Sequence, residues 1–343
     1  MARGPEGVAV ELTTVTEEGA VLHEGTAVLR LDGLAPDSEH EIADQRFRTL
    51  PRPAGERLAT VATVNDLHLG ETECGRHDTF AMGPVLAAEP GTVPYPEVMA
   101  RGAAAEIAEV APDAVVAKGD LTATGRPEEL ATFDDCFGTF DGRLHWVRGN
   151  HDVVDGGAVE GRRTAEVALP GVVLALLDTS VPGEAGGALG GDQLEWLDEV
   201  GARADRPVLV FGHHQPWDPG ESGRSAAYFG IRPDDSERLV DVFARRTRLV
   251  GYFAGHTHRN RVRRFAATGD VPWVEVGSTK DFPGGWAEYR VFEGGMLQVF
   301  HRTSTPAALA WSERTRSLFG GLYPAYSFGG LADRCLPVSF RTP

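Results

Sequence analysis

The sequence predicts an α/β fold with helices and strands in layers, preceded by a small β region. Short apolar runs typical of fully buried strands recur between residues 58 and 254. Helical periods separate several of these runs, and strands that alternate with helices are typical of layered α/β domains. Of the 343 residues, 42% are hydrophobic, which is enough to fill a core.

Residues 1–55 form the predicted β region. Apolar and polar residues alternate there, as in half-buried strands, at Val8–Leu12, Ala27–Leu31 and Arg46–Leu50. The segment from Gly33 to Pro51 resembles the end of a fibronectin-type-III-like domain. A whole sandwich of that kind needs about 100 residues, so we expect half of one at most, with its strands packed on the main body.

The main body is predicted over residues 58–301. Apolar runs predict buried strands at Leu58–Val64, Ala114–Ala117, Leu144–Val147, Val172–Leu177, Val208–Phe211 and Leu249–Ala254. Periodic segments predict helices at Ala100–Val110, Pro127–Phe137, Asp192–Arg203 and Asp234–Arg246. Strand patterns return at Trp273–Val276, Trp286–Phe292 and Met296–Phe300. Residues 302–343 form an aromatic, Gly-rich extension without a clear period, which could cover a sheet edge or form a homodimer contact.

The chain carries 33 Lys+Arg and 50 Asp+Glu, a formal net charge of −17. Because phosphate-rich partners require clustered basic residues, we expect neither a nucleic-acid polymer nor a membrane surface as partner. The three cysteines form no C-x-x-C pair, and the N-terminus has no apolar signal region. No stretch approaches the roughly 18 apolar residues of a membrane helix. These features predict a cytoplasmic protein.

Polar clusters directly follow the buried strands, where ligands bind in open α/β sheets. In chain order they are Asn65–His68, Lys118–Asp120, Arg148–Asp152, Phe211–His214 and Ala254–His258. A lone Asp-x-His or His-x-His is commonly a surface turn, but chance would rarely place every cluster at a strand end. Asp, Asn and His without sulfur fit Mn, Fe, Zn or Co better than a structural zinc site.

The order D-x-H, GD, GNHD, GHH and GHTH resembles the calcineurin-like metallophosphoesterase superfamily over about residues 58–300. Gly119–Glu129 (GDLTATGRPEE) and GNHD are similar to bacterial class III cyclic-nucleotide phosphodiesterases and glycerophosphodiesterases. The resemblance implies a four-layer sandwich, with two mixed sheets flanked by helices. Purple acid phosphatases carry a Tyr shortly after GD, where this chain has Leu121, Thr122 and Ala123, so no purple centre is expected.

The resemblance also implies a site for two divalent metal ions. It assigns Asp66, His68 and His258 to one metal, Asn150, His213 and His256 to the second, and Asp120 to both. His213 is preferred over His214 because the family's ligand directly follows the strand, which leaves His214 to line the substrate pocket. His151 would face the substrate phosphate together with Asn150 and protonate the leaving group, and Asp152 would orient it.

The predicted function is therefore hydrolysis of small soluble phosphodiesters, of cyclic-nucleotide or glycerophosphodiester type, by a hydroxide that two metals share. A phosphomonoesterase of the same fold is the alternative. A non-catalytic scaffold is disfavoured because no metal ligand is missing. The long segment between Leu69 and Glu97 could shape substrate choice or be a surface insertion.

Overall fold

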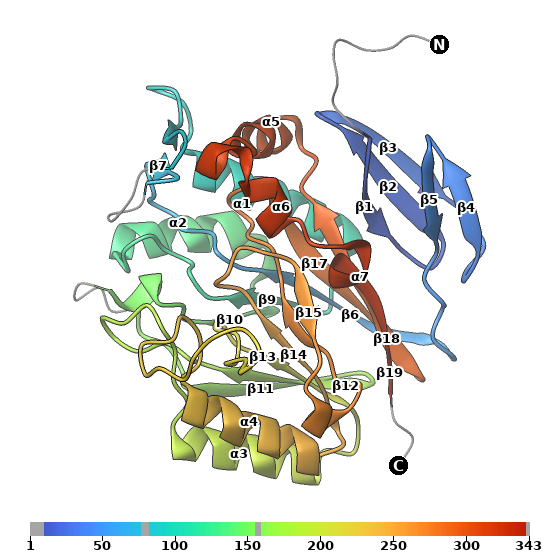
Figure 1. The fold of residues 1–343 in the computed structure, drawn as a ribbon, viewed down its shortest axis with the longest axis vertical. Helices are drawn as coiled ribbons and strands as arrows, with labels where there is room; N and C mark the ends of the chain where they lie inside the picture. The colour runs from blue at the N-terminus through green and yellow to red at the C-terminus, as the bar shows by residue number, and fades with distance from the viewer. Residues whose placement is uncertain (1–9, 77–81, 155–158, 341–343) are drawn as a thin grey trace.

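A computed structural model describes residues 10–76, 82–154 and 159–340. Two six-stranded sheets face each other, and helices cover their outer faces (Figure 1). The first sheet has the order β10-β9-β6-β17-β18-β19 and the second has the order β11-β12-β13-β14-β16-β15. Both contain parallel and antiparallel pairs, so the predicted four-layer arrangement with two mixed sheets is confirmed.

The strands of the first sheet are β6 (Arg57–Val64), β9 (Ala114–Lys118), β10 (Leu144–Val147), β17 (Gly285–Phe292), β18 (Gly295–Arg302) and β19 (Cys335–Ser339). Those of the second are β11 (Thr164–Leu169), β12 (Val172–Leu177), β13 (Val208–Phe211), β14 (Leu249–Ala254), β15 (Arg261–Arg263) and β16 (Trp273–Glu275). The parallel strands β6, β9, β10, β13 and β14 all lead into the polar clusters that the sequence singled out.

Apolar side chains fill the space between the sheets and between each sheet and its helices. Val61, Leu174 and Phe253 belong to the cluster between the sheets. The helices α1 (Tyr95–Val110) and α2 (Pro127–Phe137) pack on the first sheet, and α3 (Gly191–Arg203) and α4 (Pro233–Arg245) pack on the second. Strands covered on both faces need apolar residues at every position, which explains the continuous apolar runs in the sequence.

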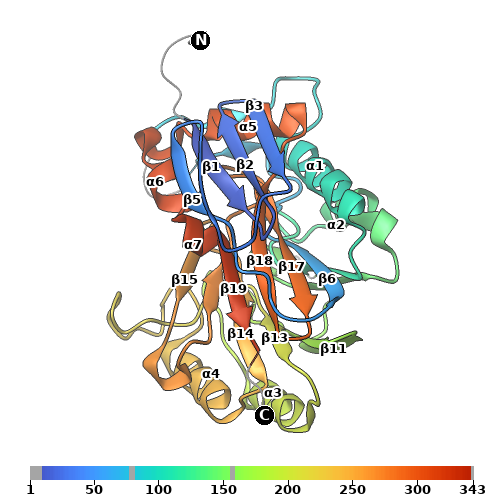
Figure 2. The same ribbon diagram turned by 90° about the vertical axis from the view of Figure 1, so that its right-hand side faces the viewer.

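The N-terminal strands pack on the main body, next to β17 and β18 (Figure 2). They are β1 (Glu11–Val15), β2 (Gly19–Glu24), β3 (Ala27–Asp32), β4 (Glu39–Ile42) and β5 (Gln45–Arg48). The first two residues of the predicted strand Val8–Leu12 lie outside the described residues. Leu22 and Phe47 join Leu297 and Val299 in one buried apolar cluster.

A buried ionic network also lies beside this contact. The Glu288 carboxylate is 1% exposed and accepts hydrogen bonds from Arg57, Arg290 and His301 at 2.9–3.0 Å. Arg290 in turn donates to Glu17, just after β1, at 2.8 Å. The network therefore couples the first sheet to the N-terminal strands.

The C-terminal segment contains α5 (Pro306–Thr315), α6 (Tyr323–Ser327), α7 (Leu331–Arg334) and β19. β19 pairs antiparallel with β18 and forms the edge of the first sheet. Trp311 of α5 stacks on Tyr95 of α1, with ring centroids 4.1 Å apart. The segment is thus built into the sheet and its helical cover. No helix among the described residues combines the length and apolarity needed to cross a membrane.

Candidate metal centre

The structure brings all seven predicted metal ligands together where the strand ends of the two sheets meet. Each ligand lies in the loop that follows a strand: Asp66 and His68 after β6, Asp120 after β9, Asn150 after β10, His213 after β13, and His256 and His258 after β14. All but His258 are buried, and His258 is partly buried. The side chains converge because the parallel strands end at the same edge of each sheet.

The first group of side chains is Asp66, His68 and His258. One ligand atom from each lies within 4.8 Å of the others, and His258 Nε2 is 3.7 Å from Asp66 Oδ1. The backbone N–H of His256 donates to both Asp66 oxygens at 3.0 and 3.1 Å, and Asn65 Nδ2 donates to Asp66 Oδ2 at 2.6 Å. Asp66 is therefore fixed by hydrogen bonds while one face remains directed at the histidines.

The second group centres on His213. Its Nδ1 lies 2.8 Å from the carbonyl oxygen of Lys118, which can only accept, so Nδ1 carries the proton. Nε2 is then directed at two further oxygens, Asn150 Oδ1 at 3.2 Å and Asp120 Oδ2 at 3.3 Å. In a neutral ring Nε2 is an acceptor that faces acceptors, which is the arrangement expected around a cation.

Asp120 lies between the two groups. Its Oδ2 is 3.5 Å from His68 Nε2 and 3.3 Å from His213 Nε2, and its Oδ1 accepts the backbone N–H of His151 at 2.8 Å. One carboxylate oxygen thus faces a histidine from each group.

Two buried nitrogens give an independent test of metal binding. His68 Nε2 and His256 Nε2 have no hydrogen-bond partner among the described residues, although both are enclosed. An unpaired buried polar atom costs free energy, so a missing partner such as an ion is indicated. Nitrogen and carboxylate oxygen donors without sulfur suit first-row divalent metals. The His/Asp cluster could therefore hold metals.

The backbone around the cluster is unusual. Five of the seven predicted ligands, Asp66, His68, Asp120, His256 and His258, have φ between 48° and 67°. This left-handed region is unfavourable for non-glycine residues, and such strain concentrates at functional sites. Position 149 requires a glycine for steric reasons, because a Cβ there would lie 2.1 Å from Asp120 Oδ1.

The protonation states suit metal binding. Burial holds the pKa values of His68 and His256 well below the ordinary range, so both rings are neutral and can coordinate. Burial alone would raise the pKa of Asp120, but His213 and His151 outweigh it and hold the pKa well below its usual value. Asp120 also raises the pKa of His213 to about 9 against the effect of burial, so this position favours positive charge, and a metal ion bound there would take the place of the Nε2 proton.

His214 has a different environment from its neighbour. Its Nδ1 lies 2.8 Å from Thr179 Oγ1, its Nε2 lies 3.3 Å from the carbonyl oxygen of Ala185, and its ring packs against His256. Both nitrogens are thus occupied, which favours His213 as the ligand. His214 is also absent from the pocket lining, so the structure does not support the substrate contact predicted for it.

The orienting role predicted for Asp152 is corrected by the structure. His151 Nδ1 is held by the carbonyl oxygen of Ala123 at 2.9 Å. Asp152 is completely buried and accepts four hydrogen bonds, from the N–H groups of Leu121, Thr122 and Gly149 and from Thr122 Oγ1, at 2.7–3.2 Å. Asp152 therefore joins the loops after β9 and β10 and does not contact His151.

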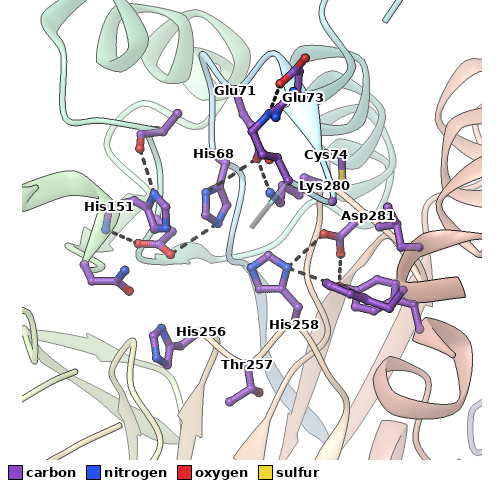
Figure 3. Close-up of a pocket in the computed structure, with 18 of the residues that line it drawn as sticks. His68, Glu71, Glu73, Cys74, His151, His256, Thr257, His258, Lys280 and Asp281 are labelled. Carbon is purple, nitrogen blue, oxygen red and sulfur yellow. Dashed lines mark hydrogen bonds and ion pairs between the residues drawn. The ribbon is translucent and has the colours of Figure 1, made fainter. Parts of the chain in front are cut away.

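Sequence reasoning missed a second layer of polar residues behind the histidines. Asp281 Oδ2 lies 3.1 Å from His258 Nδ1 (Figure 3). Asp281 Oδ1 accepts a hydrogen bond from Tyr323 Oη at 2.7 Å. Lys280 forms an ion pair with Glu71, whose Oε2 is 3.9 Å from His68 Nδ1. Glu71 is only three residues from His68, whereas Lys280, Asp281 and Tyr323 come from later segments, so no local spacing in the sequence links those three to the ligands.

The cluster opens into a pocket of about 1040 Å³. His68, Asp120, Asn150, His151, His256 and His258 line its floor. The segment between Leu69 and Glu97 contributes Gly70–Arg76 and Met82 to the lining, and contains the short strands β7 (Glu73–Cys74) and β8 (Leu86–Ala87). Residues 77–81 of that segment lie outside the described residues. The described part therefore borders the site.

Comparison with known proteins identifies the family. The family model for calcineurin-like phosphoesterases matches residues 59–260. The chain belongs to this family. Glycerophosphodiester phosphodiesterase GpdQ of Enterobacter lignolyticus (strain SCF1) is 30% identical over 161 residues, 43% of this chain and 56% of the relative. The 3',5'-cyclic adenosine monophosphate phosphodiesterase CpdA of Pseudomonas aeruginosa is 30% identical over 152 residues, 43% of this chain and 54% of that relative.

The chain spans about half the length of these curated relatives. A solved structure of a dimetal phosphatase from Danio rerio has the same fold, with a TM-score of 0.59. The two chains are 14% identical over 83% of this chain and 100% of that one, so this likeness concerns the fold alone.

Proposed function

We propose that this protein is a binuclear metal-dependent phosphodiesterase that hydrolyses small phosphodiesters. The observation that carries the proposal is the position of Asp120, whose Oδ2 faces a histidine of each ligand group on the floor of an open pocket. Membership of a phosphoesterase family and the names of two relatives, a glycerophosphodiester phosphodiesterase and a cyclic-nucleotide phosphodiesterase, support the reaction class.

Asp66, His68 and His258 would hold one cation, Asn150, His213 and His256 the other, with Asp120 shared. When bound, two such ions activate water and neutralise charge on the phosphate oxygens. Asn150 is uncharged, so only Asp66 and Asp120 add negative charge among the seven ligands. Two divalent cations would more than balance that charge. The site is therefore positive enough to attract an anionic ester despite the acidic chain.

His151 is the candidate acid. Its ring borders the pocket, 4.4 Å from the ring of His68 by centroids. The Ala123 carbonyl accepts from Nδ1, so Nε2 is left to face the phosphate and the leaving oxygen.

A small substrate is proposed because a long polyanion would extend over acidic surface. A reducing, cytoplasmic location is also proposed, supported by three cysteines that are buried and unpaired.

The test is hydrolysis of bis(p-nitrophenyl) phosphate and p-nitrophenyl phosphate by protein loaded with Mn, Fe, Zn or Co. We expect metal-dependent turnover with higher kcat/KM on the diester, and a large loss in Asn150→Ala. His145→Ala, a substitution in the strand β10 that precedes the same loop, is the matched control. Absence of metal-dependent turnover, or an unchanged rate in Asn150→Ala, would contradict the proposal; a strong monoester preference would favour a phosphomonoesterase.

A further inference from the structure

Part of the pocket lining is apolar and exposed. Phe229, Leu322 and Tyr326 line the pocket and are 52%, 62% and 46% exposed; Met82, which is 47% exposed, lines it as well, from the segment after β6. We call Phe229, Leu322 and Tyr326 the apolar wall. Single exposed apolar residues are common on protein surfaces, but several on the lining of one pocket beside a candidate metal cluster form a local feature that needs a cause.

Two residues of the apolar wall contact the turn that carries His256 and His258. Phe229, in the loop between β13 and α4, lies over the ring of His256 with centroids 3.9 Å apart and planes 30° apart. Tyr326 of α6 donates from Oη to the carbonyl oxygen of Thr257 at 2.9 Å. Both residues therefore flank the same turn, 256–258, that supplies two ligands. Leu322 directly precedes α6.

The charged residues of the pocket are already paired. Among the described lining residues, Arg76 forms an ion pair with Glu73, and Lys280 forms one with Glu71. Asp281 is engaged by His258 and Tyr323. A second phosphate on the substrate would therefore meet paired cations and acidic groups. Beyond the phosphate position, the apolar wall therefore offers the substrate an uncharged surface beside the turn that supplies His256 and His258.

We infer that the apolar wall is a subsite for a flat, apolar ester group, such as an aromatic ring, attached to the phosphate that the metal centre holds. This inference rests on the proposed function and specifies its substrate class. Ligand pockets combine an apolar lining with a few polar groups that orient the ligand, and here the metal ligands would supply the orientation. Aromatic side chains also favour offset stacking or edge contacts with a flat ring.

The kinetic test compares two diesters, bis(p-nitrophenyl) phosphate and glycerophosphoethanolamine, which has no aromatic group. The ratio of variant to wild-type kcat/KM is taken within each substrate, so differences in intrinsic reactivity cancel. We expect Phe229→Ala and Leu322→Ala to lose about tenfold on the aryl diester and less than about twofold on the other. Leu29→Ala, at an exposed leucine in β3, is the matched control and should change neither ratio.

Tyr326→Phe keeps the ring and removes the hydroxyl, and Phe229→Leu keeps an apolar side chain. We expect both to retain more aryl-diester activity than the alanine variants. Equal losses on both diesters would overturn the inference, because they would show that Phe229 acts only through His256. Unchanged kcat/KM on the aryl diester in the alanine variants would overturn it as well.

A binding measurement separates this inference from the proposed function. Titration of metal-loaded protein with phenylphosphonate and methylphosphonate, followed by calorimetry, needs no turnover. We expect phenylphosphonate to bind about tenfold more tightly in the wild type and the two affinities to converge in Phe229→Ala. Equal affinities in the wild type would overturn the subsite. Discrimination without any diester hydrolysis would contradict only the proposed phosphodiesterase activity.

Discussion

His258 Nδ1 lies 3.1 Å from Asp281 Oδ2, which places a buried carboxylate behind a candidate metal ligand. Burial alone would lower the pKa of His258, but Asp281 and Asp66 outweigh it and raise the pKa. Ligating histidines commonly donate their second N–H to such a carboxylate, which fixes the ring and strengthens the nitrogen as a donor. Tyr323, through its hydrogen bond to Asp281, extends this support into α6.

We therefore predict that Asp281→Ala weakens metal affinity by roughly 10–100-fold, because His258 loses the partner that orients it. Metal affinity would be measured by competition with a chelator, alongside metal content by elemental analysis. Tyr323→Phe leaves Asp281 in place and should produce a smaller loss. An unchanged affinity in Asp281→Ala, with the fold intact, would show that His258 is oriented by other contacts.

His151 gives a prediction about rate rather than metal binding. His151→Ala should lower kcat on a diester by roughly 10²–10⁴, the range typical of general acid–base groups. Metal content should remain at the wild-type level, because His151 is not among the predicted ligands. Steady-state kinetics and elemental analysis on the same preparation would check both statements, with His145→Ala as the control. A rate loss accompanied by metal loss would instead indicate a ligand role.

Asp152 should matter for stability because it accepts four hydrogen bonds in a fully buried position. Asp152→Asn keeps one acceptor oxygen and places a donor NH2 group against N–H donors. We predict a destabilisation of about 1–3 kcal/mol, measured by urea unfolding. Asp141→Asn, at an exposed position, should change the free energy of unfolding far less. Equal stability of the two variants would be inconsistent with the loop-joining role.

The lowered pKa of Glu288 predicts that the protein loses stability in acid. Burial alone would raise its pKa, but His301 and Arg290 outweigh it and lower the pKa below its usual value. The folded-state pKa is thus below the unfolded value of about 4.3, so the stabilisation is complete above that pH. It is lost progressively as the pH falls from about 4.3 toward the folded-state pKa.

Glu288→Gln should therefore cost about 3–5 kcal/mol at pH 7, because Arg57 and Arg290 lose a buried partner. Its unfolding free energy should also depend less steeply on pH below about 4.3 than that of the wild type. Urea unfolding at pH 7 and at pH 3.5 would measure both effects. Parallel pH dependence in the two proteins would mean that other carboxylates control acid unfolding.

The sequence predicted those features whose signals are local. The helix Pro127–Phe137 has the predicted bounds, because its proline and acidic first turn are strong start signals. The apolar runs located the central strands, because burial on both faces leaves a continuous pattern. The C-terminal helices were not predicted, since two of them have only four or five residues and show no full helical period.

The residues of the candidate site also fall into those with a local sequence signal and those without one. The candidate ligands could be proposed from sequence because each lies in a short motif at a strand end, two of them in Asp66–His68 and two in His256–His258. Asp281 and Tyr323 were not, because they are 23 and 65 residues from His258 and only the fold brings them near it. Asp152 was predicted to orient His151, the residue before it, but its side chain bonds to the loops after β9 and β10. Both residues lie in a 3-10 turn, where consecutive side chains point about 120° apart, so neighbours in sequence face different surroundings.

The contact between α6 and Asp281 has a consequence for biosynthesis. All seven candidate ligands, from Asp66 to His258, are translated before Asp281 and Tyr323, and β19 follows later still. A nascent chain can therefore present the ligands before it has the residues that orient His258 and the strand that closes the first sheet. High-affinity metal acquisition should consequently be a late event, after the helices behind the pocket have been synthesised and have docked.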